Sequence, residues 1–315
     1  MITTTSTLPA PVQQSFNMKL LATPVPDLIH KIPAMLLRMP RNGGKILRSR
    51  RYNALPTATV PLGNSGIYPA PVQLSAVDID AQMSFYGQYI EMNEQVTLQA
   101  QDAPLNEAAL RLGVSMRQTE DELTRDMLLA TASFINCAGG NNGDNPTQLS
   151  RGDIDIATKA LRNANGRYIN DYSEGENKIA TNPVRDAYLG LASTNLIGQF
   201  DQVVGWVSKW NYPLVSKSYT AEEGAIANVR ILLSSIGSVS ANASQAGSDV
   251  YNMFICAQEA FAGVEQDGYS NQFIYRPPIY NGPLALNAEV GYKFADAPHI
   301  TNDAWVLNLR MTLAV

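Results

Sequence analysis

The sequence of 315 residues is poor in the residues that carry chemistry: it has two cysteines, Cys137 and Cys256, and two histidines, His30 and His299. Cysteines with apolar flanks favour two buried free thiols over a disulfide or a metal pair. Neither histidine lies near a Cys-x-x-Cys, a His-x-x-x-His or a serine-rich elbow, so the motifs of zinc sites and nucleophilic hydrolases are missing. The sequence therefore predicts no enzyme, no metal site and no cofactor.

Long apolar runs and ligand-binding loops are missing as well. No stretch of 18 apolar residues exists, and the N-terminus has no charged-then-apolar signal, so we expect neither a membrane span nor standard export. The glycine-rich Gly139–Gly143 lacks the lysine and Ser/Thr of a phosphate loop. Asp153 and Asp155 lack the glycine turn and distal glutamate of a calcium loop, and we interpret them as first-turn acids of a helix. Glu222 and Glu223 are interpreted as adjacent solvated acids.

Charge is unevenly distributed along the chain. The net charge is −5, but residues 1–71 hold eight basic residues and one acid, Asp27, so this part carries +7 and the remainder −12. Such a chain suits complementary contacts with copies of itself or with an acidic partner. The alternative is a basic arm that lies on the acidic body of its own chain, and the sequence leaves both open.

Proline marks the N-terminal part, since ten of the 18 prolines precede Val72. Proline removes a backbone donor and fixes φ, so we expect residues 1–44 to form an extended arm. This arm carries apolar side chains that it cannot bury alone, including Leu20, Leu28, Ile29 and Leu36.

Two segments after the arm have strand patterns. Lys45–Leu55 is predicted as one strand and Gln73–Phe85 as another, because Val77, Ile79, Ala81, Met83 and Phe85 alternate with polar residues. The turn-rich Pro61–Gly66 between them predicts a hairpin about 33 Å long at 3.3 Å per residue. A lone hairpin is marginal in water, so this one needs a neighbour to lie on.

The dominant pattern is a helical stripe over Asp102–Gly140, which predicts a spine helix that Gly139 and Gly140 end. Its apolar or small residues follow steps of three and four: Leu105, Ala109, Leu112, Met116, Leu123, Met127, Ala130 and Phe134. Two exposed ion pairs are expected on it, Glu107 with Arg111 and Asp121 with Arg125.

The rest predicts a compact α+β domain without repeats. Asp153–Asn165 is expected as a short amphipathic helix, and residues 168–280 alternate short apolar strands with helical pieces. A final strand, with Trp305, Leu307, Leu309, Met311 and Leu313 on one face, is expected to pair within a sheet beside the spine.

The ordered set of segments from about Lys45 to Arg310 resembles the major capsid proteins of tailed bacteriophages with the Hong Kong 97-like fold, and in particular the N-four-type coat protein family. The segments are Arg50–Pro56, Pro61-Leu62, Tyr86–Ile90, Asp121–Asp126, Asn182–Val184, Tyr188-Leu189, Glu223–Arg230, Val290–Phe294 and Asn302–Trp305. Asn182 stands where many members have histidine, Gly198–Ser218 fits the pattern poorly, and the lysine that cross-links the best-known member has no assignable counterpart.

The resemblance implies an α+β fold with five parts. They are an N-terminal arm (1–44), an extended hairpin or E-loop (45–98), the spine helix of a P-domain (99–140), an A-domain (141–284) and returning P-domain strands (285–315). It also implies a major capsid protein that assembles into hexamers and pentamers, located in the virion and assembled in the bacterial cytoplasm. Expected partners are the chain itself, separate scaffolding, portal and decoration proteins, and enclosed double-stranded DNA contacted non-specifically, without a membrane.

Two alternatives stay open. One is a protein-only compartment of the same fold, similar to encapsulins, and the other is a soluble oligomeric enzyme with a site in residues 141–284. For the capsid interpretation, the candidate contacts between subunits are charged residues at the hairpin and on the spine. They are Lys45, Arg48, Arg50, Arg51, Asp78, Asp80, Glu120 and Asp121, with Arg48 and Arg50 expected to meet acids of a neighbour and Arg51 to tie the hairpin to its own body.

Overall fold

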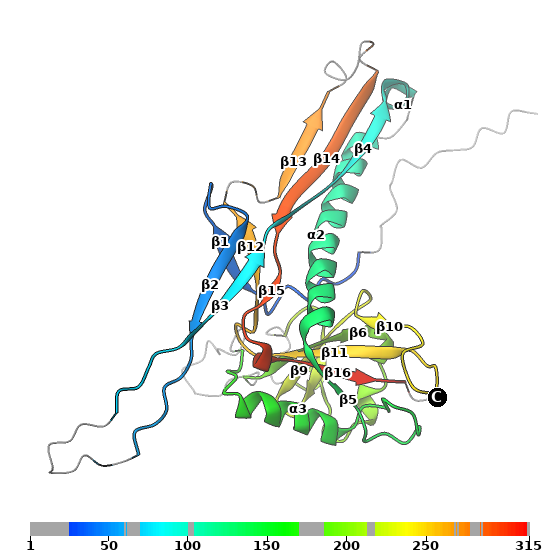
Figure 1. The fold of residues 1–315 in the computed structure, drawn as a ribbon. Coiled ribbons are helices and arrows are strands. Elements are labelled where there is room, and N and C mark those ends of the chain that lie inside the picture. Colours follow the sequence, from blue (N-terminus) through cyan, green and yellow to red (C-terminus); the bar gives the residue numbers. More distant parts are fainter. Residues whose placement is uncertain are drawn as a thin grey trace, which may run out of the picture.

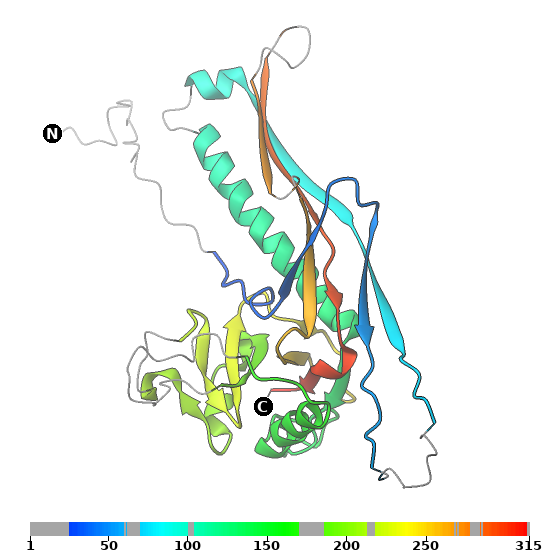
Figure 2. The same ribbon diagram turned by 90° about the vertical axis from the view of Figure 1, so that its left-hand side faces the viewer.

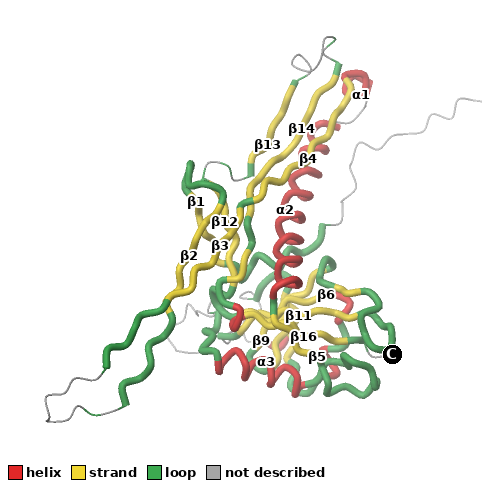
Figure 3. The backbone as a smooth tube through the Cα atoms, in the orientation of Figure 1, coloured by secondary structure: helices red, strands yellow, loops and turns green. Residues whose placement is uncertain are grey.

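A computed structural model describes residues 25–59, 61, 70–99, 104–169, 186–212, 218–267, 269, 271–277, 284 and 286–313. Several predicted features lie outside these residues: Leu20 in the arm, Asp102 at the start of the spine, the hairpin tip from Leu62 to Gly66, and Asn182–Val184. In the described part, strands predominate over helices (Figure 3). None of the described helices is long and apolar enough to cross a membrane.

The compact end of the molecule is built on an eight-stranded sheet. Seven of its strands follow the order β5-β16-β11-β6-β9-β8-β7, and the eighth, β10, pairs with β11. Its strands are β5 (Ser133–Asn136), β6 (Tyr188–Ser193), β7 (Val207–Ser208), β8 (Glu222–Ile226), β9 (Val229–Ser234), β10 (Val239–Ser240), β11 (Val250–Cys256) and β16 (Val306–Met311). The central strands β6, β9 and β11 are buried at every residue. Such continuous burial is what a sheet covered on both faces requires.

Helix α3 (Arg151–Asn163) covers one face of this sheet, and the base of the spine covers the other (Figure 1). Ile154, Ala157 and Leu161 of α3 are fully buried, which confirms the predicted amphipathic helix. Ser150 and Asp153 form a capping box at its start, so Asp153 is a helix-terminal acid as predicted. Short 3₁₀ turns connect the strands: Thr194–Leu196, Phe200–Gln202, Lys209–Asn211 and Asp303–Trp305.

The spine helix α2 (Pro104–Thr131) has 28 residues and rises from the compact end for about 42 Å at 1.5 Å per residue (Figure 1). A three-stranded sheet with the order β13-β14-β4 lies along it. Leu112 and Met116 of the predicted stripe pack against Tyr292 and Phe294 of this sheet. The strands are β4 (Ser84–Asn93), β13 (Gln272–Arg276) and β14 (Asn287–Asp296), and the short helix α1 (Glu94–Gln99) follows β4.

The predicted end of the spine is wrong. The helix stops at Thr131, and Ser133–Asn136 is a strand that pairs in parallel with β16. Phe134 and Ile135 suit a strand by propensity, and Ile135 packs on the core beneath the sheet, so tertiary pairing overrides the helical period here. The final strand β16 pairs within the sheet and sends Leu307, Leu309 and Met311 into the core, as predicted.

Strands β2 (Ile46–Tyr52) and β3 (Ala76–Gln82) form the predicted antiparallel hairpin. Figures 1 and 2 show that it stands clear of the body in both views. The base of the hairpin joins a small core with the sheet formed by β1 (Met35–Met39), β12 (Phe261–Gln266) and β15 (His299–Ile300).

The expectation of an unpacked arm is wrong for its described part. β1 pairs in parallel with β12, and Met39 is buried in the core at the hairpin base. Ile29 is fully buried and belongs to one apolar cluster with Leu128 of the spine and Phe254 of the large sheet. The arm can pack because its apolar residues are buried against the spine and the large sheet of the same chain.

Candidate assembly site

The hairpin carries four of the predicted contact residues as two cross-strand pairs, which we call the hairpin ladder: Arg48 with Asp80 and Arg50 with Asp78. Arg48 donates to both Asp80 oxygens at 2.7 and 2.8 Å, and Arg50 donates to both Asp78 oxygens at 2.7 and 3.1 Å. These bonds lower the pKa of Asp78 and of Asp80 and raise the pKa of both arginines. The ladder is exposed, and its charges balance within one chain.

The opposite face of the hairpin is largely apolar. Leu47 and Ala81 pack into the core at the hairpin base, whereas Val77, farther out, is 40% exposed. Arg51 lies on this face and donates to the backbone oxygen of Thr301 at 3.4 Å, which ties the hairpin to its own body as predicted. Lys45 is exposed at the base. The hairpin thus presents one charged face and one apolar face.

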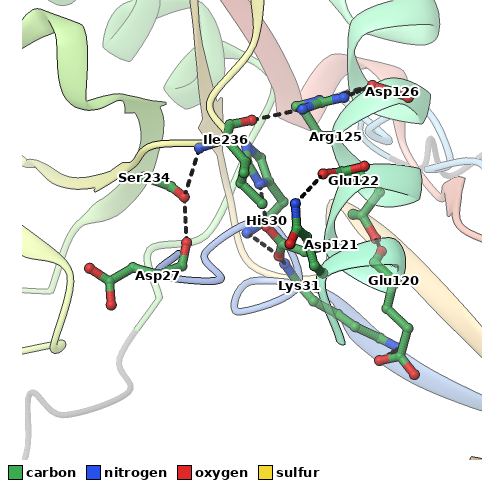
Figure 4. Close-up of polar contacts among 12 residues, drawn as sticks. Asp27, His30, Lys31, Glu120, Asp121, Glu122, Arg125, Asp126, Ser234 and Ile236 are labelled. Carbon is green, nitrogen blue, oxygen red and sulfur yellow. Dashed lines mark hydrogen bonds and ion pairs between the residues drawn. The ribbon is translucent and has the colours of Figure 1, made fainter. Parts of the chain in front are cut away.

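The other two predicted residues, Glu120 and Asp121, lie buried beneath the arm (Figure 4). Asp121 accepts hydrogen bonds from the backbone N–H of His30 at 2.8 Å and of Lys31 at 3.1 Å, and its second oxygen lies 2.7 Å from Nδ1 of His30. We call this set the arm–spine junction. The carboxylate of one helix residue therefore holds two successive residues of the arm.

Lys31 extends the junction to three carboxylates from three elements. Its Nζ lies 3.3 Å from Glu120, 3.6 Å from Asp296 of β14 and 3.8 Å from Glu265 of β12. Burial raises the pKa of Asp296, and the charge of Lys31 opposes that rise. One lysine of the arm therefore links the spine to two separate sheets.

Further contacts join the junction to the compact end. The hydroxyl of Ser234, at the end of β9, donates to the backbone oxygen of Asp27. Arg125 donates to the backbone oxygen of Ile236 at 2.9 Å and pairs with its neighbour Asp126. The predicted pair of Arg125 with Asp121 is therefore wrong, because Asp121 is turned beneath the arm. The predicted pair of Glu107 with Arg111 is present.

The interpretation of Glu222 as a solvated acid is also wrong. Glu222 is fully buried and accepts two hydrogen bonds from Arg230 of the adjacent strand, at 2.9 and 2.5 Å. Tyr212 donates to the same carboxylate at 2.9 Å, and the guanidinium lies over the ring of Tyr219. This pair neutralises two charges inside the compact end, so we assign it to stability.

Of the eight predicted contact residues, six lie on the hairpin and two in the junction. Sequence reasoning missed the partners of the two junction acids, which are His30 and Lys31 for Asp121 and Lys31 for Glu120. The available signal was the polar pair Glu120-Asp121 on the side of α2 that buries Met116 and Leu128. Charged residues on a buried helix face need partners, but their identity depends on the fold. Contacts of these eight residues with a neighbouring subunit stay a prediction.

The described residues offer little for catalysis. They contain no group of three or more His, Cys, Asp or Glu side chains placed to hold a metal ion. Cys137 and Cys256 are both free and buried, as predicted, and burial raises the pKa of each thiol. A thiol in that state is a poor nucleophile.

Neither a protein-family model nor a curated protein sequence matches this chain. Solved structures do match over nearly the full length. The chain is similar to the capsid of Ralstonia phage GP4, with a TM-score of 0.68 and 12% identity, covering 97% of this chain and 96% of that one. The head structure of Helicobacter pylori bacteriophage KHP40 has a TM-score of 0.64 and 13% identity, covering 100% and 98%. The capsid of cyanophage Pam1 has a TM-score of 0.64 and 10% identity, covering 97% of each chain.

At these identities the likeness shows the fold. The spine helix with its long sheet, the compact end and the projecting hairpin form the Hong Kong 97-like capsid fold, as the sequence predicted.

Proposed function

We propose that this chain is the major capsid protein of a tailed bacteriophage, and that it assembles into hexamers and pentamers of an icosahedral shell. The observation that carries the proposal is the hairpin, which stands clear of the body with the apolar side chains of Leu55, Val72 and Leu74 more than half exposed. A hairpin of two strands is marginal in water, so its long projection requires support from a neighbour. The shared capsid fold supports the same conclusion.

The five-part division is included in the proposal: an N-terminal arm (1–44), a hairpin (45–98), a spine (99–140), an A-domain (141–284) and returning P-domain strands (285–315). We assign the hairpin ladder, with Lys45 and Arg51, to the presentation of the hairpin to a neighbouring subunit. Glu120 and Asp121 contribute by holding the arm of their own chain against the spine.

The shell encloses double-stranded DNA, and scaffolding, portal and decoration proteins are separate partners. The net charge of −5 supports a protein that does not read bases. Binding to DNA should therefore be weak and should decline as salt is added, because only phosphate contacts contribute. The chain is located in the virion and is assembled in the bacterial cytoplasm.

The experiment is expression of the chain alone and together with a candidate scaffolding protein, followed by size exclusion and electron microscopy. We expect hexamers, pentamers or closed shells tens of nanometres across. The matched control replaces residues 53–75 with a two-residue turn, which keeps the paired strands β2 and β3 but removes the projection, and it should stay unassembled. A wild type that stays monomeric at high concentration with scaffold present would contradict the proposal.

A compartment of the same fold is the second candidate, because the fold alone does not decide what a shell contains. The nucleic-acid content of purified particles separates the two, since a capsid from infected cells holds DNA and a compartment holds protein cargo. A soluble enzyme would give a small defined oligomer instead of a shell.

A further inference from the structure

Strand β13 is an edge strand of the sheet that lies along the spine, in the part of the chain that the structure describes. The strand that pairs with it there is β14, in a regular antiparallel register from Gln272 to Arg276. Natural proteins protect such edges with lysine, proline, a bulge or a covering segment, because unpaired N–H and C=O groups recruit other strands. The sequence Gln-Phe-Ile-Tyr-Arg of β13 contains no lysine and no proline, and its pairing with β14 has no bulge.

The side chains of this edge are apolar on both faces. Phe273, Ile274 and Tyr275 are consecutive, and they are 51%, 41% and 54% exposed. Phe273 points towards the spine, where its ring covers Gly113, and Ile274 points to the opposite face beside Gly291. An edge that exposes apolar groups on both faces is a strong pairing surface.

The same end of the molecule exposes other large apolar side chains. Val96 and Leu98 of α1 and Leu284 and Leu286 before β14 are exposed, and both segments lie at the far end of the spine (Figure 1). Several large exposed apolar side chains at one end of a molecule are typical of a surface that a partner covers. This end is therefore built to be covered in an assembly.

The pattern of β13 identifies what covers it. If two copies of the strand pair antiparallel with Ile274 opposite Ile274, then Phe273 lies opposite Tyr275 of the other copy, and Gln272 lies opposite Arg276. Every aromatic residue then has an aromatic partner, and such cross-strand pairs stabilise a sheet. A contact in which both copies use the same patch is isologous and lies on a two-fold axis.

We propose that β13 pairs with β13 of a second copy and joins the two three-stranded sheets into one continuous sheet. This inference rests on the proposed capsid function. Contacts around a hexamer or pentamer are heterologous, so an isologous contact must lie between capsomers, on a two-fold or quasi-two-fold axis of the shell. β13 is thus the surface that holds neighbouring capsomers together.

Disulfide trapping with Ile274→Cys tests the register. Residues directly opposite in an antiparallel pair have Cβ atoms about 4.5–5.5 Å apart, which a small local adjustment brings into disulfide range. Shells of I274C are assembled under reducing conditions and then mildly oxidised, and we expect disulfide-linked dimers on a non-reducing gel. Wild-type shells are the first control, because Cys137 and Cys256 are buried and should stay unlinked.

Two further variants fix the register. Phe273→Cys alone places its thiols on a diagonal about 7–8 Å apart and should link poorly, whereas shells mixed from F273C and Y275C should give linked heterodimers. Ile274→Lys should still form capsomers but should fail to join them into shells, since it places two like charges directly opposite.

Each outcome is decisive. Shells that form with I274C but give no linked dimer, and none in the mixed F273C and Y275C shells, overturn the pairing and leave the capsid function standing. Links from the thiol of the I274C variant to a different protein overturn the choice of a second copy as the occupant. A wild type that forms no shell overturns the proposed function and this inference with it.

Discussion

The arm–spine junction and the hairpin ladder both pair acids with bases brought together by the fold, but they differ in burial. Asp121 is 1% exposed, whereas the side chains of Arg48 and Arg50 in the ladder are 62% and 57% exposed. Water screens the ladder, so its pairs fix register without adding much stability. The centre of the junction, His30 with Asp121, is buried, and the loss of one partner there leaves buried polar groups unpaired. The difference separates residues that hold the subunit together from residues that shape a surface.

The largest expected effect is at the centre of the junction. Asp121→Ala should lower the free energy of unfolding by about 3 kcal/mol, because the N–H groups of His30 and Lys31 lose a buried acceptor. Chemical denaturation measures the change. Asp126→Ala, on the same helix but with a side chain 61% exposed, is the matched control and should change stability by less than about 0.5 kcal/mol. Equal midpoints for the two variants would refute this view of the junction.

The next effect is the pH dependence contributed by Asp296. Burial raises its pKa in the folded state above the ordinary value of 3.8, so the folded protein binds this proton more tightly than the unfolded chain does. The corresponding stability is fully present below pH 3.8 and is lost as the pH rises through the folded pKa. Asp296→Asn removes this pH-dependent contribution. Across that pH range we expect the difference in unfolding free energy between wild type and the variant to change by about 1 kcal/mol or less.

Melting curves at about pH 3, below the ordinary value, and at about pH 7 provide the measurement. The stability gap between the D296N variant and wild type should shift in favour of the variant as the pH rises. The companion variant Glu265→Gln, whose carboxylate is 29% exposed and faces the same lysine, should show little of this trend. If the stabilities of wild type and D296N change with pH in the same way, burial does not raise the pKa of Asp296.

The junction also shows how far sequence reasoning reaches. The helical period placed Leu112 and Met116 correctly because apolar burial is a local pattern with a known repeat. It could not assign His30 to Asp121, because the two residues are 91 positions apart and only the fold brings them together. Strand β5 was predicted as helix for a related reason, since its pairing with β16 outweighs the local period. The ordered family-like segments, in contrast, predicted the fold class correctly.

The ladder should respond to acid in the opposite sense from Asp296. Hydrogen bonds from Arg48 and Arg50 lower the pKa of Asp80 and of Asp78 below 3.8. Pairing in the hairpin is therefore favoured above that value and is lost only as the pH falls through the lower, folded-state values. Hydrogen exchange of the β2 and β3 amides should show constant protection from about pH 7 to about pH 4, after correction for intrinsic rates. Loss of protection already at about pH 5 would contradict the arginine pairing.

The smallest effect on stability, and the sharpest on assembly, concerns the charges of the ladder. Replacing Arg48 and Arg50 with glutamate places like charges opposite Asp80 and Asp78. We therefore expect the two hairpin strands to separate and shells to fail, while the melting of the body stays nearly unchanged.

The fourfold exchange R48D/D80R/R50D/D78R restores both cross-strand pairs with reversed direction. If the ladder acts within one chain, by keeping the hairpin straight, this exchange should recover shells in electron micrographs. If Arg48 and Arg50 instead meet acids of a neighbouring subunit other than its Asp78 and Asp80, the exchange places like charges across that interface and assembly stays lost. Recovery therefore shows that the four ladder residues pair among themselves, and continued failure with intact β2–β3 exchange protection assigns Arg48 and Arg50 to a contact with other acids of the neighbour.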